Sequence, residues 1–582
     1  MHDASNMVFV NIIALAILIT ALLIYKFAYP RKNIPALILV ILFSLLPIIS
    51  IFREGVYESG DFTINIYKTI SLLKSWSDGI YIARWAPLLN ANYGYPLFIF
   101  TYPLPYYIVA LISLTGISLV LSLKIFLSLL FIASGIMMYF WAKSELGKWP
   151  AFVAAIFYLY APYHLVDLHF RVTIGELLAF CFLPTVLLSI RQSLLYKNTV
   201  WNFALSLSIA GLILSHQGIT IVAFPLFIIY CLFLLKKKKH ISNKVVLRCI
   251  LHITYGLLLS SFYWLPVLYE LKYTHQAFYL PAITFPSLKE FIYSPYRYGL
   301  LLQGPTGQLS FIIGYVQLGI ILISVYILKN KYGDKSERQL LKFFIFLFIA
   351  FFILMQGFSK PIWETIPILL NLQFSYRILV LVNLVTAFIA AITVKIVDNR
   401  TYTITICILA IGLTILNWGH RRVIPEINDK HLYINTPQST HQAEGLNPAA
   451  PIWTDPYRPW MEKTPKLNAE IIRGDGSVQP IWRTTAKHQY LVQSNTDTLM
   501  RENTLYFPGW KLLIDNKEIT IDKSKLQSGV IVFPLNEGLH LVTLEFVDTK
   551  VRFVSKLVSL LTLIFLTIVV IKKYTPLWKR KL

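Results

Sequence analysis

The stretch MVFVNIIALAILITALLIYKFA runs from Met7 to Ala28 and carries no charged residue before Lys26. A helix needs about 20 consecutive apolar residues to cross the hydrocarbon core of a bilayer, and this stretch has that length. About thirteen stretches of this kind recur along the chain as far as Val570, with short loops between most of them. The pattern predicts a polytopic α-helical membrane protein with about thirteen transmembrane helices. The first stretch lacks a basic leader and an A-x-A-like cleavage site, so we expect it to be retained as a helix.

Composition and charge also indicate a membrane location. Hydrophobic residues make up 56% of the 582 residues, and the formal net charge is +24. Basic residues gather in short loops such as Lys236–Lys239 and Lys572–Lys573, a distribution that orients membrane helices and attracts anionic lipid headgroups. Membrane topology therefore accounts for the charge, and we expect membrane lipids and no nucleic acid as partners.

Orientation follows from placing Lys236–Lys239 in the cytoplasm of a cell membrane (the cytoplasmic or inner membrane). Alternating spans, one of them a single helix near residues 247–268, then put residues 53–96 outside as a large first loop, on the same side as a polar block near the C-terminus. If Leu97–Thr115 crossed the membrane completely, the spans would no longer alternate in this way. Its Pro-rich start favours a broken or interfacial helix. Residues 62–75 have apolar side chains at helical spacing, which predicts an amphipathic surface helix or a plain connecting helix.

The chain divides into three parts by composition. We expect a transmembrane domain over residues 1–418, a β-rich extracytoplasmic domain over 419–551, and a last transmembrane helix with a basic tail over 552–582. Short apolar or alternating runs separated by turn residues predict a small β-sandwich-like domain of roughly 100 residues in the second part. The predicted strands are Trp510–Ile514, Ile519–Ile521, Val530–Leu535 and His540–Val547. Its aromatic residues Trp482, Tyr506 and Trp510 could stack on a glycan, although aromatic residues in a small sandwich more often fill the core.

Ionisable residues gather at one predicted face of the membrane. Asp61 follows the second apolar stretch, where a carboxylate can act as a general base, coordinate a divalent ion or stay solvated. The densest polar run lies between two predicted helices and includes Asp167, His169, Arg171 and Glu176. Arg171 could bind a phosphate through its planar guanidinium group, or it could pair with Glu176 and close the helix entrance.

Three further polar residues lie at the same predicted face. Arg84 belongs to the first external loop. His216 lies at a helix junction, where it could cap a helix or line a site. Arg377 opens another helix and could reach either lipid headgroups or a ligand phosphate. His164 and His169 are five residues apart and do not share a helix face, so their spacing does not favour a zinc site.

These features resemble the GT-C superfamily of integral-membrane glycosyltransferases. The resemblance rests on Asp61 after an early helix, on the stretch Asn92–Pro96 (NYGYP), and on a pattern that runs from Gly147 through Tyr160–Tyr163 (YAPY) to Arg171 and Glu176. More narrowly, the chain resembles YfhO-type proteins and the bacterial membrane family labelled 6-pyruvoyl-tetrahydropterin synthase-related. The matching pieces are Ser215–His216 (SH), Trp264–Pro266 (WLP), Leu372–Phe374 (LQF) with Arg377, and Tyr506–Lys511 (YFPGWK) with Asp515. Such families often have Phe-Pro-Trp-Arg where this chain has Phe374–Arg377 (FSYR), which predicts a different helix entrance.

The resemblance implies a sugar donor on a polyprenyl phosphate and a cell-envelope glycan or protein as acceptor. It implies Asp61 as the catalytic base, Arg171 or Arg377 as the phosphate ligand, and Glu176 as the residue that orients the acceptor or a metal. Some members of the superfamily use a divalent ion, so the resemblance allows Mg or Mn as a cofactor without requiring it. We expect the remaining polar residues at this face to line the substrate site, namely Arg84, Asp167, His169 and His216. Pterin synthesis is not expected, because that reaction belongs to a soluble zinc enzyme with clustered histidines.

Two other functions stay open. A GT-C-like fold with a degenerate site would serve as a non-catalytic assembly factor or scaffold of the cell envelope. A lipid-linked glycan transporter or polymerase would need charged residues at helix midpoints, whereas the predicted helix centres here are almost uncharged.

Overall fold

The computed structural model describes residues 2–196, 199–238, 241–275, 283–419, 422–437, 450–456, 461 and 463–579. The chain forms two compact units. Unit 1 comprises residues 1–62, 120–257 and 282–426. Unit 2 comprises residues 63–119, 258–281 and 427–582, so both units are built from segments far apart in the sequence.

The helices confirm a polytopic membrane protein. Within the described residues, seven helices are long and apolar enough to cross a membrane, or ten if each of three bent helix pairs counts as one span. The prediction of about thirteen transmembrane helices also counted apolar stretches that form shorter helices in the structure. These are Ala36–Phe52, Val200–Ser215 and Tyr315–Lys329.

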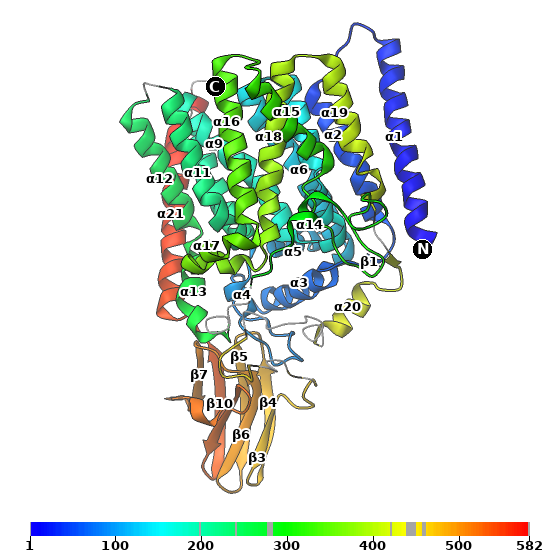
Figure 1. Ribbon diagram of the computed structural model, residues 1–582. Helices are drawn as coiled ribbons and strands as arrows, with labels where there is room; N and C mark the ends of the chain where they lie inside the picture. Colours follow the sequence, from blue (N-terminus) through cyan, green and yellow to red (C-terminus); the bar gives the residue numbers. More distant parts are fainter. Residues whose placement is uncertain are drawn as a thin grey trace. The chain divides into compact units, whose positions relative to one another are not determined.

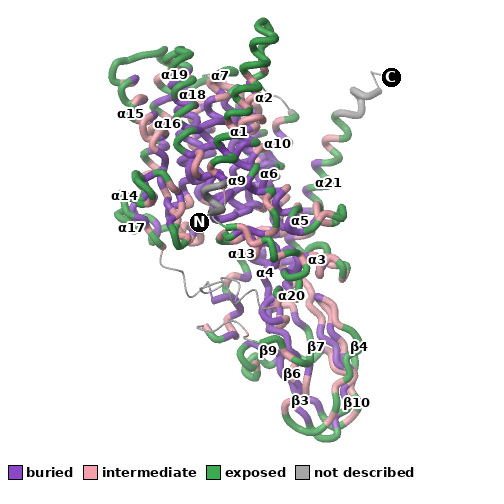
Figure 2. Tube along the Cα trace, turned by 90° about the vertical axis from the view of Figure 1, so that its right-hand side faces the viewer, coloured by how far each residue is buried: buried purple, intermediate pink, exposed green. Residues whose placement is uncertain are grey.

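Unit 1 is a bundle of long helices (Figure 1). Two of them, α9 and α18, are buried along most of their length, whereas α1 exposes most of its side chains (Figure 2). Each of these three is apolar on all sides, as expected of helices surrounded by protein or lipid. The helices of unit 1 are α1 (His2–Ala28), α2 (Ala36–Ile48), α6 (Leu119–Leu146), α7 (Lys148–Leu159), α8 (Pro162–Leu165), α9 (Ile174–Tyr196), α10 (Thr199–Ser215), α11 (Gln217–Lys237), α12 (Asn243–Leu259), α14 (Leu288–Ile292), α15 (Tyr315–Lys329), α16 (Lys335–Leu354), α17 (Lys360–Thr365), α18 (Leu379–Val397) and α19 (Arg400–Gly412).

Two of the sequence predictions about helices are confirmed, and a third differs from the structure. The segment 97–115 is broken as expected, into α4 (Leu97–Phe100) and α5 (Leu104–Ser113), with prolines at the break. The helix predicted over residues 62–75 is α3 (Phe62–Ser77). The single helix predicted over residues 247–268 is instead two helices, α12 and α13 (Ser261–Glu270), which are bent by 66° relative to each other.

Unit 2 carries the β domain, which forms two antiparallel sheets as predicted. The larger sheet has the strand order β4-β5-β10-β7-β8, and the smaller has the order β3-β6-β9. The predicted strands Trp510–Ile514 and Val530–Leu535 are found with these bounds. The strands are β3 (Ala469–Arg473), β4 (Gly476–Arg483), β5 (Lys487–Ser494), β6 (Thr498–Leu505), β7 (Trp510–Ile514), β8 (Lys517–Ile519), β9 (Val530–Leu535) and β10 (Gly538–Phe546).

Hydrogen bonds join the β domain to α3 (Phe62–Ser77), and an ion pair joins two helices of unit 2. Asp78, at the end of α3, accepts hydrogen bonds from the backbone N and the Oγ1 of Thr485, both at 2.7 Å. Helix α13 packs against the last helix, α21 (Lys550–Lys579). There Arg552 Nη2 lies 2.9 Å from Glu270 Oε2, and both side chains are fully buried. Glu270 lies in an apolar helix, so it needs such a partner.

A buried carboxylate joins the two sheets of the β domain. Glu502 on β6 accepts a hydrogen bond from Tyr490 Oη at 2.9 Å, and Arg483 Nη1 lies 3.2 Å from the same oxygen. His488 Nδ1 lies 2.9 Å from that oxygen as well. Burial alone would raise the pKa of Glu502, but His488 and Arg483 outweigh burial and lower the pKa to about 2.

This lowered pKa predicts acid sensitivity of the β domain. Ionised Glu502 stabilises the fold above its ordinary pKa of 4.5, and that stabilisation is lost as the pH falls toward 2. We expect pepsin to cleave the β domain of the full-length protein increasingly fast over this range. Glu502→Gln should be cleaved faster than wild type at pH 4.5 and should differ least from it near pH 2. The exposed Glu537→Gln serves as the matched control, and equal cleavage of wild type and Glu502→Gln at pH 4.5 would contradict the prediction.

Candidate functional site

The candidate site of unit 1 lies where a membrane helix breaks. Helix α7 ends at Leu159, and Pro162 starts the short helix α8, which continues as a π-helix over Val166–Arg171. Helices α7 and α8 are bent by 51° relative to each other. Val172 then has φ 57° and ψ 46°, a left-handed conformation that a β-branched residue rarely adopts. Strained residues and π-helical turns are both frequent at functional sites.

Arg171 is the centre of a buried charge network in this break. Its Nη1 donates to Asp167 Oδ1 at 2.6 Å and to Tyr163 Oη at 2.5 Å. Its Nη2 donates to Glu176 Oε1 at 3.0 Å. Tyr163 Oη in turn donates to Glu176 Oε2 at 2.8 Å. The sequence left two roles open for Arg171, namely phosphate binding and an ion pair with Glu176. The structure contains the ion pair.

Glu176 also joins two more elements to the network. Arg377 Nε, just before α18, lies 3.1 Å from Glu176 Oε1. His216 Nε2 lies 3.9 Å from the same oxygen, while its Nδ1 accepts the backbone N–H of Ile219 at 3.1 Å and caps α11. The structure therefore brings together three segments that are distant in sequence, around residues 163–176, 216 and 377.

The formal charges of the network cancel. The guanidinium groups of Arg171 and Arg377 face the carboxylates of Asp167 and Glu176, and Glu176 and Asp167 are fully buried. Burying charges is costly, and pairing offsets that cost only when hydrogen bonds satisfy the groups, as they do around Arg171. Tyr376 covers one side of the Arg171 guanidinium, 5.4 Å from its ring centroid. Such a network is rigid and can hold the segments around it in one arrangement.

The backbone of Asp61 is attached to this network. The N–H of Asp61 donates to the carbonyl oxygen of Arg171 at 2.8 Å, and the N–H of Gly60 donates to that of Phe170 at 2.9 Å. A Cβ atom on Gly60 would lie 3.2 Å from the Arg171 carbonyl oxygen, so glycine permits this close approach. The Asp61 side chain is half-buried, at the residue that immediately precedes α3.

The loop before Asp61 is anchored as well. Strand β1 (Val56–Tyr57) pairs with β2 (Val423–Ile424). The ammonium group of Lys124, a buried residue of α6, donates to the carbonyl oxygens of Arg53 and Gly55, the latter at 2.6 Å. The loop is thus held on both sides, so its end at Asp61 has a defined position.

The remaining predicted site residues lie in different surroundings. His169 is fully buried within the π-helix. Arg84 belongs to unit 2, where its Nη2 donates to the carbonyl oxygen of Phe262 at 2.8 Å, and the structure does not join it to the network. Sequence reasoning singled out Tyr163 as part of a family-like pattern but gave it no role in the site, and it missed Lys124. Tyr163 precedes Arg171 by eight residues, and the contact between them is seen only in the structure. Lys124 could have been noticed as a cation within an apolar stretch.

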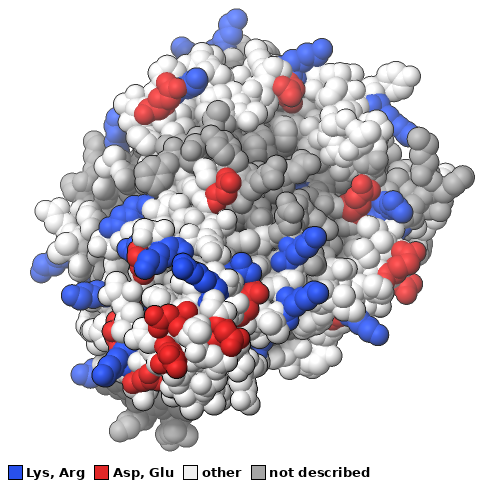
Figure 3. All heavy atoms as spheres, turned by 90° about the horizontal axis from the view of Figure 1, so that it is seen from below, with Lys and Arg blue, Asp and Glu red and all other residues white. Residues whose placement is uncertain are grey.

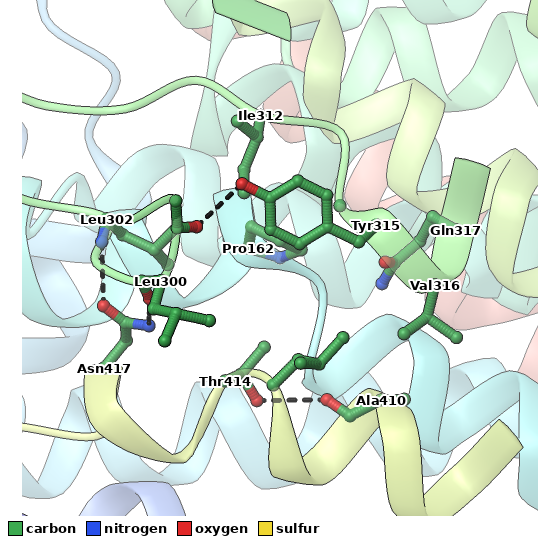
Figure 4. Close-up of a pocket in the computed structure, with 13 residues that line it drawn as sticks. Pro162, Leu300, Leu302, Ile312, Tyr315, Val316, Gln317, Ala410, Thr414 and Asn417 are labelled. Atoms are coloured by element: carbon green, nitrogen blue, oxygen red, sulfur yellow. Dashed lines mark hydrogen bonds between the residues drawn. The ribbon is translucent and has the colours of Figure 1, made fainter. Parts of the chain in front are cut away.

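A small cavity lies beside Pro162 in unit 1 (Figure 4). Its volume of about 20 Å³ is that of a single water site, which is too small for a sugar. Tyr315 Oη donates to the Gly299 carbonyl oxygen at 2.7 Å, and Asn417 binds the backbone of Leu302 and Leu300. The cavity therefore belongs to the packing around the helix break. Separately, no group of three His, Cys, Asp or Glu side chains able to hold a metal ion occurs in the described part of the chain, and the divalent cation stays a prediction.

The fold and the network define a polytopic membrane protein with a buried charge cluster at a helix break and a β domain before its last helix. The chain belongs to the membrane-protein family described as "6-pyruvoyl-tetrahydropterin synthase related domain", whose model matches residues 99–423, more than half of the chain.

Comparisons with individual proteins give more distant similarities. An uncharacterized protein of Lactococcus lactis subsp. cremoris is 24% identical over 251 residues, which are 42% of this chain and 41% of that protein. The arabinofuranosyltransferase AftD from Mycobacteria is 14% identical, with a TM-score of 0.44, over 66% of this chain and 26% of that one. The apo oligosaccharyltransferase of Archaeoglobus fulgidus is 14% identical, with a TM-score of 0.44, over 66% of this chain and 55% of that one. The chain thus spans well under two thirds of each of these proteins.

Proposed function

We propose that this protein is a membrane glycosyltransferase that moves a sugar from a polyprenyl-phosphate donor to a cell-envelope acceptor. The observation that supports it most is the attachment of Asp61 to the buried network around Arg171. A half-buried carboxylate held by its backbone at a fixed point is suited to general base catalysis.

In this reaction Asp61 accepts the proton of the acceptor hydroxyl. The acceptor oxygen then bonds to the anomeric carbon of the sugar as the bond from that carbon to the phosphate oxygen breaks. The electron pair of the broken bond leaves with the polyprenyl phosphate. No step requires a metal, and adding EDTA to the transfer assay tests the possible use of Mg or Mn.

We assign Arg171 and Glu176 as positioning residues for Asp61. Both are already engaged within a network whose charges cancel, so Arg171 offers little uncompensated charge to a phosphate. Asp167, His216 and Arg377 support the same arrangement. The donor would reach the enzyme on the extracytoplasmic face of the cell membrane, because nucleotide sugars are cytoplasmic and a lipid carrier can bring the sugar across.

Within unit 2, Arg84 is a candidate ligand for a lipid phosphate by the charges around it. Burial lowers the pKa of Arg84, and the nearby Asp548 offsets burial only in part. Asp548 pairs with Lys556, and the nearby Glu270 pairs with Arg552. The three cations and two carboxylates leave one positive charge in excess, and Arg84 Nε has no hydrogen-bond partner among the described residues.

Replacing Arg84 should therefore weaken donor binding. A charge-assisted hydrogen bond contributes about 1.5–3 kcal/mol, so Arg84→Gln should raise the Kd for a polyprenyl-phosphate sugar about 10- to 100-fold. Binding of a radiolabelled donor to protein in nanodiscs measures this change. Arg84→Lys should keep part of the affinity, and the exposed Arg473→Gln should keep all of it. An unchanged Kd in a folded Arg84→Gln protein would remove Arg84 from the phosphate site.

The function itself is tested by sugar transfer in proteoliposomes. Purified protein would receive radiolabelled polyprenyl-phosphate sugars, and transfer or donor hydrolysis would be measured. Activity that depends on Asp61 would support a glycosyltransferase. Failure of a folded wild-type protein to bind any donor of a broad panel would instead favour a scaffold in the cell envelope.

A further inference from the structure

One aromatic residue of the β domain is left outside its core. Trp510 and Tyr506 are buried, which is the packing role that the sequence analysis weighed against glycan stacking. Trp482 on β4, in contrast, is 49% exposed. A large exposed aromatic side chain on a sheet face is a common feature of binding surfaces, because it offers apolar area at a low cost in conformational entropy.

A β-bulge directs Trp482 to the outer face of the larger sheet. The register between β4 and β5 shifts between Pro480 and Trp482, so that Trp482 pairs with Gln489 and Arg483 pairs with His488. Side chains of a strand alternate between its two faces, and His488 is buried in the core. Trp482 therefore lies on the outer face together with Gln489. Without the extra residue, Trp482 would point inward and Arg483 outward.

Polar side chains that form hydrogen bonds continue this row across the sheet. Gln489 on β5 pairs in register with Thr543 on β10, and Gln489 Nε2 donates to Thr543 Oγ1 at 3.3 Å. Thr543 is buried, so its hydroxyl positions the Gln489 amide and does not itself face a ligand. Neighbouring strands are about 4.8 Å apart, so Gln489 lies about one strand spacing from Trp482. An amide group both donates and accepts hydrogen bonds, as sugar hydroxyls require.

The charges on this face are paired. Lys487 Nζ lies 2.6 Å from Glu545 Oε1, and Lys511 Nζ lies 2.8 Å from Glu518 Oε2. Acidic and basic side chains are also interspersed on the surface seen in Figure 3. A face whose charges cancel gives no advantage to a polyanion or an anionic lipid surface over an uncharged ligand.

We propose that the outer face of β4, β5 and β10 binds an uncharged glycan chain. The apolar face of one sugar ring stacks on the Trp482 indole, and hydroxyl groups of the chain bond to the Gln489 amide. The role of this chain as acceptor rests on the proposed glycosyltransferase function, whereas its binding does not.

Binding of neutral polysaccharides to the full-length protein tests the proposal. Dextran, mannan and galactan would be probed on an array with labelled protein in detergent, together with heparin as an anionic comparison. We expect binding to at least one neutral glycan through this face, whereas heparin binds the basic loops of a chain with net charge +24 and should bind wild type and Trp482→Ala equally. Trp482→Ala should weaken that binding tenfold or more, and Trp482→Tyr should keep most of it. Leu539→Ala is the matched control, because Leu539 lies on the same face and is 60% exposed.

Each other outcome overturns the proposal. If wild type binds none of these three glycans, or if a folded Trp482→Ala binds them as wild type does, there is no glycan-binding surface at this face. Loss of binding to phosphatidylglycerol vesicles in Trp482→Ala, with glycan binding unchanged, would make the face a membrane contact. The glycan-binding proposal and the glycosyltransferase proposal can be tested separately. Asp61→Asn should bind the glycan normally while losing sugar transfer. Trp482→Ala should still transfer sugar to a short soluble acceptor.

Discussion

The Asp61→Asn variant is expected to lose sugar transfer by a factor of about 10²–10⁴ while keeping its fold and its affinity for the donor. Asparagine has the shape of aspartate but cannot take a proton from the acceptor hydroxyl. The backbone N–H that binds the Arg171 carbonyl oxygen is unaffected by the change, so the loop should keep its position. The measurement is the initial rate of transfer from a radiolabelled polyprenyl-phosphate sugar in proteoliposomes.

Glu58→Gln provides a matched control for this experiment. Glu58 is an exposed carboxylate only three residues before Asp61, and it should be dispensable. Equal loss in both variants would indicate a general effect of negative charge on the loop. Full transfer by Asp61→Asn, with the protein folded, would exclude Asp61 as the base.

The second large effect is expected from Glu176→Ala, which should lower the free energy of unfolding by about 3–5 kcal/mol. Glu176 contacts Arg171, Arg377 and Tyr163, and its removal leaves Arg377 without this ion-pair partner and Arg171 with Asp167 alone. The uncompensated charge at a buried site makes the change costly. Denaturant titration of the detergent-solubilised protein, followed by tryptophan fluorescence, measures it.

An exposed ion pair provides the reference value for the loss of unfolding free energy in this experiment. Lys360 and Glu364 lie 3.5 Å apart with about 60% of each side chain exposed, so Glu364→Ala should cost about 0–1 kcal/mol. The double variant Arg171→Ala/Glu176→Ala should be less destabilised than the sum of the two single variants, because the two residues contact each other. Additive effects would argue against a coupled network.

Much of the local structure could be predicted from the sequence. The strands Trp510–Ile514 and Val530–Leu535 match the prediction because period-two patterns and turn residues are local signals. The break in the segment 97–115 follows from its prolines. The 66° bend after α12 differs from the single predicted helix, although the Ser260–Ser261 pair lies at the bend and such pairs are among the usual causes of sharp kinks.

The sequence predicted which residues belong to the candidate site better than it predicted how those residues are arranged. Charged residues in apolar stretches, such as Glu176 and Arg171, are conspicuous because burial demands a partner or a role. Their choice of partners was open, because a guanidinium group serves a carboxylate and a phosphate equally well. The structure shows Arg171 engaged by Asp167 and Glu176, and it shows Arg84 in unit 2 with a positive charge in excess around it.

The sequence by itself determined that this is a polytopic membrane protein with a β domain before its last helix, because hydrophobic length and periodicity act within single segments. Tertiary structure alone decided which distant residues meet, such as Arg377 with Glu176 and the backbone of Asp61 with that of Arg171. It also decided, through one bulge in β4, that Trp482 faces outward while Arg483 reaches the core. Contacts of this kind depend on how helices and strands pack, and packing is a property of the whole chain that no local pattern specifies.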